Sequence, residues 1–195
     1  NWTGNRITCR DWFQLSLKEG LTVFRDQSFT ADLHGSGLKR IEDVSFLRNF
    51  QFTEDKGPTS HAVKPKEYVA IDNFYTTTIY EKGSELIRML ELLLGQKRFM
   101  KGIDVYIQDY DGRAATTEDF INSLKKSYLS GEKNCTLDFE KFHNWYYESG
   151  TPKVYVSQQW DSSKSILNVS FEQRIDKANN NKSKELVIPI LYSCY

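Results

Sequence analysis

Two short stretches decide the fold of this chain: Asn1-Trp2-Thr3-Gly4-Asn5-Arg6 and Leu17-Lys18-Glu19-Gly20-Leu21-Thr22. The second lies within residues 11–32, where apolar side chains recur at the spacing of an α-helix. One helical face carries Trp12, Leu15, Glu19 and Thr22, and a neighbouring face carries Phe13, Leu17, Leu21 and Phe24. Glu19 is therefore predicted to point inward. A buried carboxylate is costly unless it meets a cation or several donors, and a metal ligand would explain it. Periodicity alone favours a salt bridge or a rim position.

Further helices are predicted along the chain. One follows Asn73 and reaches Leu94, where Gly95 is a typical C-terminal stop, and another covers residues 97–110. Thr116 followed by Asp119 resembles a capping box that opens a helix to about residue 129. Asp138 is predicted to cap a helix that ends near residue 148.

Beyond Pro152 the apolar period changes to two, which indicates strands around residues 154–156, 166–171 and 186–191. The change predicts a domain boundary near Gly150. The expected fold is mainly α with a C-terminal β segment, divided into residues 1–150 and residues 151–195.

Composition excludes several classes of protein. The chain is 39% hydrophobic and 14% aromatic, enough for a core, and its 26 basic residues balance 26 acidic ones. No general field favours nucleic acid, and no apolar run approaches the roughly 20 residues that span a bilayer. Cys9, Cys135 and Cys194 form no C-x-x-C pair, so neither a disulfide framework nor a cysteine zinc site is predicted. A reducing compartment, and hence a cytoplasmic location, is expected.

Several strings together resemble the aminopeptidase N family of gluzincin zinc metallopeptidases. Together with the two opening stretches, they occur in the family's order over roughly residues 1 to 155. The strings are Cys9-Arg10-Asp11-Trp12-Phe13-Gln14-Leu15, Thr22-Val23-Phe24-Arg25-Asp26, Asn73-Phe74-Tyr75-Thr76, Tyr80-Glu81-Lys82-Gly83 and Ser149-Gly150-Thr151-Pro152. The resemblance implies the C-terminal helical part of a thermolysin-like catalytic domain, followed by the start of a β-sandwich domain.

The resemblance also assigns roles to residues. In the family an H-E-x-x-H helix supplies two His ligands to zinc, and a Glu separated from the second His by eighteen residues supplies the third. Residues 1–18 make up those eighteen positions, so Glu19 matches the third ligand. Tyr80 matches the tyrosine whose phenol donates a hydrogen bond to the oxyanion of the tetrahedral intermediate.

Four further residues are candidates near this site. Tyr75 resembles a position that lines the pocket for the substrate's first side chain. Asp72 stands where relatives often carry a neutral residue, and we predict a substrate contact there. Lys18 and Asp26 are an opposite-charge pair eight residues apart on the Glu19 helix. They either set the charge near the metal or belong to a solvated face.

The chain is expected to be a fragment that begins just after H-E-x-x-H. The parent enzyme is then a metalloaminopeptidase that binds one zinc ion and hydrolyses N-terminal residues from peptides with a free N-terminus. This segment alone is expected to hold no zinc and to be inactive, because the two His ligands, the general-base Glu and the amine-binding G-x-M-E-N element come from the rest of the parent chain.

The string Ser60-His61-Ala62-Val63-Lys64-Pro65 departs from the family's H-P-I-R-P form. Lys64 cannot reproduce a bidentate arginine contact, and His61 is interpreted as a structural hydrogen-bonding residue. His34 and His143 have no partner at ligand spacing. Two alternatives to the aminopeptidase stay open: an epoxide hydrolase of the same fold, and a scaffold without metal. Retention of Glu19 and Tyr80 argues against the scaffold.

Overall fold

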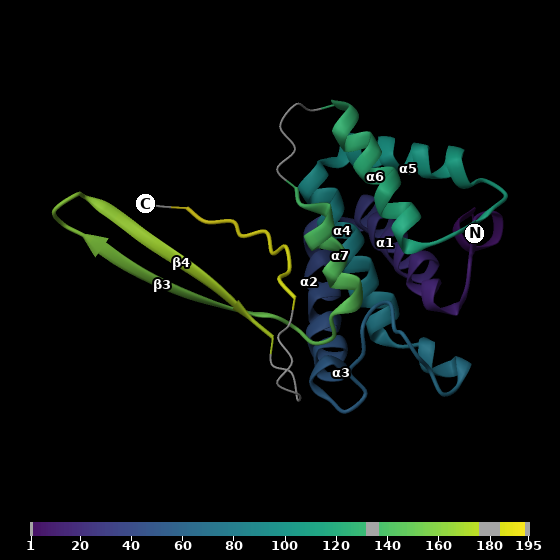
Figure 1. Cartoon of the computed structure of the whole chain (residues 1–195), viewed down its shortest axis with the longest axis horizontal. Helices are drawn as coiled ribbons and strands as arrows, with labels where there is room; N and C mark the ends of the chain where they lie inside the picture. The colour runs from purple at the N-terminus through teal and green to yellow at the C-terminus, as the bar shows by residue number, and fades with distance from the viewer. Residues whose placement is uncertain (1, 132–136, 176–183, 194–195) are drawn as a thin grey trace.

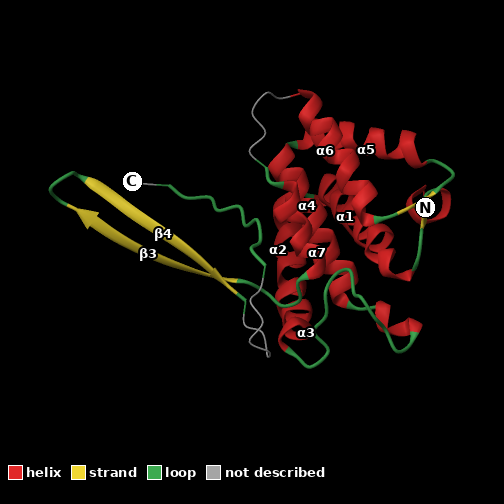
Figure 2. Ribbon diagram, in the orientation of Figure 1, coloured by secondary structure: helices red, strands yellow, loops and turns green. Residues whose placement is uncertain are grey.

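The computed structural model describes residues 2–131, 137–175 and 184–193. Helices of all types account for most of these residues, and seven of them are α-helices (Figures 1 and 2). They are α1 (Leu15–His34), α2 (Ser36–Phe46), α3 (Phe52–Lys56), α4 (Gly83–Leu94), α5 (Gln96–Tyr110), α6 (Thr117–Gly131) and α7 (Phe139–Tyr147). Short π or 3₁₀ segments lie between them: η1 (Trp2–Arg6), η2 (Trp12–Gln14), η3 (Leu47–Gln51), η4 (Ile71–Phe74) and η5 (Thr78–Lys82).

The predicted helix boundaries follow local sequence signals. Gly95, with a φ of 77°, separates α4 from α5, as expected for a residue that accepts positive φ without a Cβ penalty. Thr116 and Asp119 form a reciprocal capping box before α6, with Asp119 N donating to Thr116 Oγ1 at 3.2 Å and Thr116 N to Asp119 Oδ2 at 2.9 Å. Asp138 caps α7 by accepting from Lys141 N at 3.0 Å.

The helices surround one main hydrophobic core between α1, α4, α5, α6 and α7 (Figure 1). Leu21, Leu90, Phe99, Leu124 and Phe142 are among its buried members. The first β-strand, β1 (Thr8–Cys9), pairs in parallel with β2 (Ala114–Ala115) and ties the start of the chain to α6. The helices predicted at residues 11–32, 97–110, 116–129 and 138–148 are therefore confirmed. The one predicted to follow Asn73 and reach Leu94 is continuously helical only from Thr78, and the structure adds α2 and α3, which the sequence did not predict.

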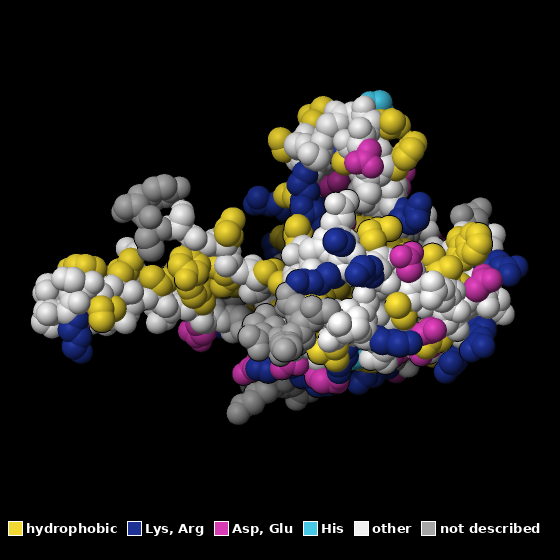
Figure 3. Space-filling model, turned by 90° about the horizontal axis from the view of Figure 1, so that it is seen from above, with side chains coloured by type: hydrophobic (Ala, Val, Ile, Leu, Met, Phe, Trp, Pro, Cys, Tyr) yellow, Lys and Arg dark blue, Asp and Glu magenta, His cyan; other side chains and the backbone are white. Residues whose placement is uncertain are grey.

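The predicted C-terminal β segment is an antiparallel hairpin of β3 (Lys153–Asp161) and β4 (Ile166–Arg174) that extends away from the helices (Figures 1 and 2). Its register places Val156 opposite Phe171 and Trp160 opposite Leu167. Residues directly opposite share one face of a sheet, so one face of the hairpin is apolar. Hydrophobic side chains are visible along this arm in Figure 3.

The strand predicted at residues 186–191 is wrong, because residues 184–193 contain no strand or helix. This segment is instead held by side chains. Gln173 accepts from Leu186 N at 3.1 Å and donates to Leu186 O at 3.0 Å, and Trp145 Nε1 donates to Val187 O at 2.8 Å. Period-two apolar spacing gives a strand only where another strand's backbone lies alongside, and here side chains of β4 and α7 take those hydrogen bonds.

No helix within residues 2–131, 137–175 and 184–193 has the length and apolar character needed to cross a membrane.

Candidate active site

The candidate site is built where α1 crosses η5 and the start of α4. Gly20 and Gly83 meet at this crossing with almost no space between the backbones. A Cβ on Gly20 would lie 2.9 Å from the carbonyl carbon of Gly83, and one on Gly83 would lie 2.4 Å from Ser16 Oγ. Glu19 directly precedes Gly20, and Tyr80 lies three residues before Gly83. The glycine contact therefore brings the side chains of Glu19 and Tyr80 together.

Glu19 lies beside two of the predicted site residues. Its carboxylate is close enough to the Tyr80 phenol for its charge to raise the pKa of Tyr80, and it forms a short ion pair with Lys18 Nζ. The Glu19 side chain is only 13% exposed, whereas that of Lys18 is 36% exposed and can leave the pair without burying a charge. The prediction that Glu19 points inward is confirmed, and a cation and a phenol lie next to it.

Lys18 also depends on Gly4 from the opening stretch. The Lys18 Cδ atom lies 2.8 Å from where a Cβ on Gly4 would stand, and Gly4 has a φ of 107°. Only glycine meets both conditions without strain. The opening turn therefore supports the stem of the lysine beside Glu19.

The Tyr80 phenol is held in its protonated form. Burial, and then the nearby Glu19 carboxylate, raise the pKa of Tyr80 to about 12. At neutral pH the phenol therefore keeps its proton and remains a hydrogen-bond donor.

Tyr75 lies beside Tyr80, with the ring centroids 6.4 Å apart and the Tyr75 side chain about half exposed. Asp72 lies in η4, where its carbonyl oxygen accepts from Tyr75 N at 3.1 Å and its side chain is exposed. The structure thus brings Tyr75 next to Tyr80, whereas Asp72 contacts neither Glu19 nor Tyr80 through a hydrogen bond or ion pair among the described residues.

Asp26 lies away from that pair. Eight residues along a helix correspond to about 12 Å, so Lys18 and Asp26 do not meet. Asp26 is exposed and lines a hollow of about 500 Å³ beside α2, together with Lys39, Glu42 and Glu81. Lys18 contacts Glu19 directly, and Asp26 does not.

The described residues of this site could supply one ligand to a metal ion. The Glu19 carboxylate is the kind of oxygen donor that zinc accepts in peptidase sites. Across the described parts of the chain, no three His, Cys, Asp or Glu side chains gather closely enough to hold a metal ion. Within these residues, Glu19 could therefore supply one zinc ligand, but they form no complete zinc site.

Three residues next to Tyr80 were not found by sequence reasoning. Glu54 accepts hydrogen bonds from Thr77 and Thr78, and Asp55 forms a buried ion pair with Lys82 at 2.9 Å. Lys82 belongs to the quoted Tyr80 string, but Glu54 and Asp55 lie in a polar stretch, residues 53–56, that reads as a solvated loop. Only the structure shows that both carboxylates turn inward.

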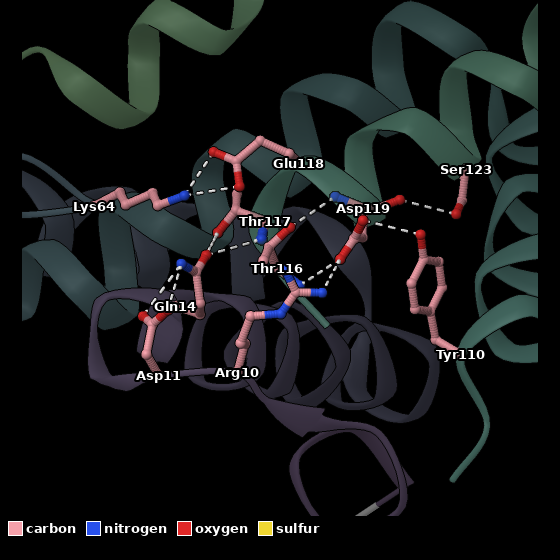
Figure 4. Close-up of polar contacts among 10 residues, drawn as sticks. All are labelled: Arg10, Asp11, Gln14, Lys64, Tyr110, Thr116, Thr117, Glu118, Asp119 and Ser123. Atoms are coloured by element: carbon pink, nitrogen blue, oxygen red, sulfur yellow. Dashed lines mark hydrogen bonds and ion pairs between the residues drawn. The ribbon is translucent and has the colours of Figure 1, made fainter. Parts of the chain in front are cut away.

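The departure from H-P-I-R-P is accommodated at the start of α6 (Figure 4). Lys64 Nζ donates to both carboxylate oxygens of Glu118, at 2.6 and 2.7 Å, so one ammonium serves where a bidentate guanidinium was expected. Next to it, Gln14 Oε1 accepts from Thr117 N at 3.0 Å, which satisfies a free donor of the helix N-terminus. This cluster joins the residue 61–65 string to α6 and lies apart from Glu19.

His61 bonds Ala62 O at 2.8 Å through Nδ1 and Thr76 Oγ1 at 2.9 Å through Nε2. It therefore links its loop to the segment that carries Tyr75 and Tyr80, in agreement with a structural role. Cys135 and Cys194 lie outside the described residues.

Comparisons with known proteins agree with the motifs. Residues 1–146 match the family model described as the peptidase family M1 domain, and residues 150–195 match a domain of unknown function described as having an Ig-like fold. Aminopeptidase N from Haemophilus influenzae is 45% identical over 196 residues, which cover all of this chain and 22% of that protein. Aminopeptidase N from Caulobacter vibrioides is 53% identical over 167 residues, which cover 86% of this chain and 18% of that protein.

A solved structure is also similar. The crystal structure of Legionella pneumophila aminopeptidase A in complex with aspartic acid superposes with a TM-score of 0.71 at 31% identity, over 89% of this chain and 18% of that one. The chain spans about a fifth of the length of the curated relatives it matches.

Proposed function

This chain belongs to peptidase family M1, and we propose that the whole protein is a zinc-dependent aminopeptidase that removes N-terminal residues from peptides. The observation that carries the proposal is the close crossing of α1 and η5, which brings the Glu19 carboxylate near the protonated Tyr80 phenol. A carboxylate and a neutral donor on adjoining helices are the two groups that the family's chemistry requires from this segment.

Glu19 would hold zinc through its carboxylate in the whole protein. When bound, the metal polarises the scissile carbonyl and generates a nucleophile at neutral pH. Glu19 is fixed for this task by its position beside the Gly20–Gly83 contact, and Lys18 can move from its carboxylate into solvent. We propose one zinc ion, with its other ligands contributed by parts of the protein outside the described residues.

Tyr80 would donate its phenolic hydrogen to the oxygen on which negative charge develops. A donor aimed at developing charge in a water-poor site is worth about 3 kcal/mol of transition-state stabilisation. The raised pKa of Tyr80 keeps that hydrogen in place throughout the physiological range. Tyr75, whose exposed ring flanks Tyr80, would line the pocket for the first side chain, and Asp72 would contact the substrate.

The division of the chain forms part of the proposal. We assign residues 1–150 to the catalytic domain and residues 151–195 to a following β domain. The two family models, which cover residues 1–146 and 150–195, support a boundary near Gly150.

The test measures zinc content and hydrolysis of an alanyl chromogenic substrate by the whole protein and two variants. Glu19→Gln should lose zinc and activity together. Tyr80→Phe should keep its zinc and KM and lose about a hundredfold in kcat, because it removes only the oxyanion donor. Glu85→Gln is the control, since it removes a half-buried carboxylate on α4 that pairs with Arg40. A wild-type protein without zinc and activity would instead support the scaffold alternative.

A further inference from the structure

Tyr80 lies in η5, a single π-type turn. Gly83 N bonds to Thr78 O, five residues back, and also to Tyr80 O, while Tyr80 N donates to Thr76 O at 3.2 Å. Isolated π turns are uncommon because their backbone geometry is less favourable than that of an α-helix. Such a turn persists where surrounding groups hold it, so the groups that hold η5 also determine where the Tyr80 phenol lies.

The start of η5 is held by one carboxylate, that of Glu54 on α3. Glu54 Oε2 accepts from Thr77 N at 3.3 Å and Thr77 Oγ1 at 2.8 Å. Glu54 Oε1 accepts from Thr78 N at 3.1 Å and Thr78 Oγ1 at 2.5 Å. Both carboxylate oxygens of Glu54 thus accept hydrogen bonds from two successive residues, which fixes the direction in which η5 begins. A second residue of the same helical region, Gln51, donates to Thr78 Oγ1 at 3.3 Å.

The end of η5 is held by the next residue of α3. Asp55 pairs with Lys82 at 2.9 Å, and their side chains are 0% and 7% exposed. Lys82 Nζ also donates to Gly150 O at 2.9 Å, and Asp55 accepts from Thr151 Oγ1 at 3.0 Å. Tyr80 therefore lies between two fixed points, both supplied by the dipeptide Glu54-Asp55.

We propose that Glu54 is a positioning residue for Tyr80: by capping the π turn at Thr77 and Thr78, it holds the Tyr80 phenol against Glu19. Its catalytic consequence rests on the proposed function, but its structural consequence does not. With the end of η5 fixed by Lys82, loss of the cap leaves the turn free to relax toward α-helical geometry. That change rotates the Tyr80 side chain about the helix axis and away from Glu19.

The electrostatics of Glu54 agree with this role. Burial alone would raise the pKa of Glu54, but the hydrogen bonds from Thr78 and Thr77 lower it below its ordinary value. The carboxylate is therefore ionised at neutral pH and can accept from all four donors. A neutral amide in its place would bring an NH₂ group against two of them.

The test uses the whole protein with 3-fluorotyrosine introduced at position 80, whose ¹⁹F chemical shift at a fixed neutral pH reports the surroundings of the ring. Glu54→Gln removes the charged cap. Thr77→Val removes the hydroxyl donor to Glu54 and keeps the charge of the Glu54 carboxylate. It therefore separates an effect of the position of Tyr80 from an effect of the Glu54 charge. Glu85→Gln is the matched control, because its side chain is 20% exposed, against 19% for Glu54, and its partner is Arg40 rather than η5.

We expect Glu54→Gln to move the ¹⁹F shift of the labelled ring toward that of a free peptide, and Thr77→Val to move it less. In unlabelled protein, Glu54→Gln should reduce kcat about tenfold with KM within about twofold, because misplacement affects the transition state more than binding. If Glu54→Gln does not fold, Thr77→Val alone decides the question.

A ¹⁹F chemical shift in Glu54→Gln or Thr77→Val that matches Glu85→Gln would overturn the proposal. The shift is compared between variants with the same zinc content, and it does not depend on turnover. A protein with no peptidase activity but with the expected change in ¹⁹F shift would therefore refute the proposed function and leave the positioning role intact.

Discussion

Apolar side chains are buried in the helical body but exposed in the β3–β4 hairpin. In the body, Leu90 and Leu124 are fully buried between helices. In the hairpin, Val156, Trp160, Leu167, Val169 and Phe171 share one face and are all 41% exposed or more. Both regions have sequences with the correct apolar period for their secondary structure. Periodicity therefore fixes which face is apolar, whereas burial depends on what lies against it.

The difference implies that the two regions contribute unequally to stability. Removing apolar area from water is the main favourable term in folding, and only the body does so extensively. The hairpin is held by its backbone ladder and by a few cross-strand contacts, such as Arg174 over the Tyr155 ring at 4.6 Å. A two-stranded hairpin alone is marginal in water.

The two regions are joined at a buried charge pair, and the largest effect is expected there. Lys82→Met should destabilise the chain by about 3–5 kcal/mol, because it leaves the fully buried Asp55 carboxylate unpaired. Urea unfolding followed by far-UV circular dichroism measures this change. The double variant Asp55→Leu with Lys82→Met should recover most of the loss. A loss below about 1 kcal/mol in the single variant would mean that the pair is solvated.

The comparison itself is tested by one truncation in each region. Leu90→Ala should cost about 2–5 kcal/mol, because it removes fully buried methyl groups and leaves a cavity. Leu167→Ala in the hairpin should cost less than about 1 kcal/mol, since that side chain is 43% exposed. Equal losses in the two variants, measured by the same urea titration, would show that the hairpin face is covered in solution.

Much of the fold was predictable because its signals are local. The capping box at Thr116 and Asp119, the cap at Asp138 and the stop at Gly95 all depend on residues a few positions apart. The conformation of residues 186–191 could not be predicted in this way, because a strand requires a neighbouring strand and local spacing does not reveal one. Periodicity identified the inward direction of Glu19. It could not identify Glu54 or Asp55, whose partners are about 25 residues away or more.

The glycine crossing that brings Glu19 to Tyr80 offers a third, smaller effect within the body. Gly83→Ala should cost about 1–3 kcal/mol, because its Cβ would lie 2.4 Å from Ser16 Oγ. Ser16→Ala removes that oxygen, and the remaining Ser16 Cβ is 3.6 Å away. The double variant should therefore be more stable than Gly83→Ala alone in thermal melting. Equal melting temperatures for the two would place the strain elsewhere, at the 3.4 Å contact with Gly20.

The smallest effect concerns carboxylates of the two regions and their response to pH. Burial would raise the pKa of Glu118, but Lys64 and the Tyr147 phenol lower it to about 2. A carboxyl group with a lowered folded-state pKa stabilises the fold above its unfolded pKa, near 4.5, and loses that contribution as the pH falls toward 2. The pair is partly exposed, so its contribution at neutral pH should be about 1 kcal/mol.

Glu118→Gln should therefore lower the unfolding free energy at pH 7, and the difference from wild type should shrink steadily between about pH 4.5 and pH 2. Glu172 in the hairpin is the counterpart, because it pairs with Arg174 at 2.8 Å in full contact with solvent. Glu172→Gln should change stability little at any pH, since solvent screens an exposed pair. A pH dependence in Glu172→Gln as steep as in Glu118→Gln would mean that the hairpin ion pair is shielded, and hence that the face of the hairpin opposite the apolar one is covered.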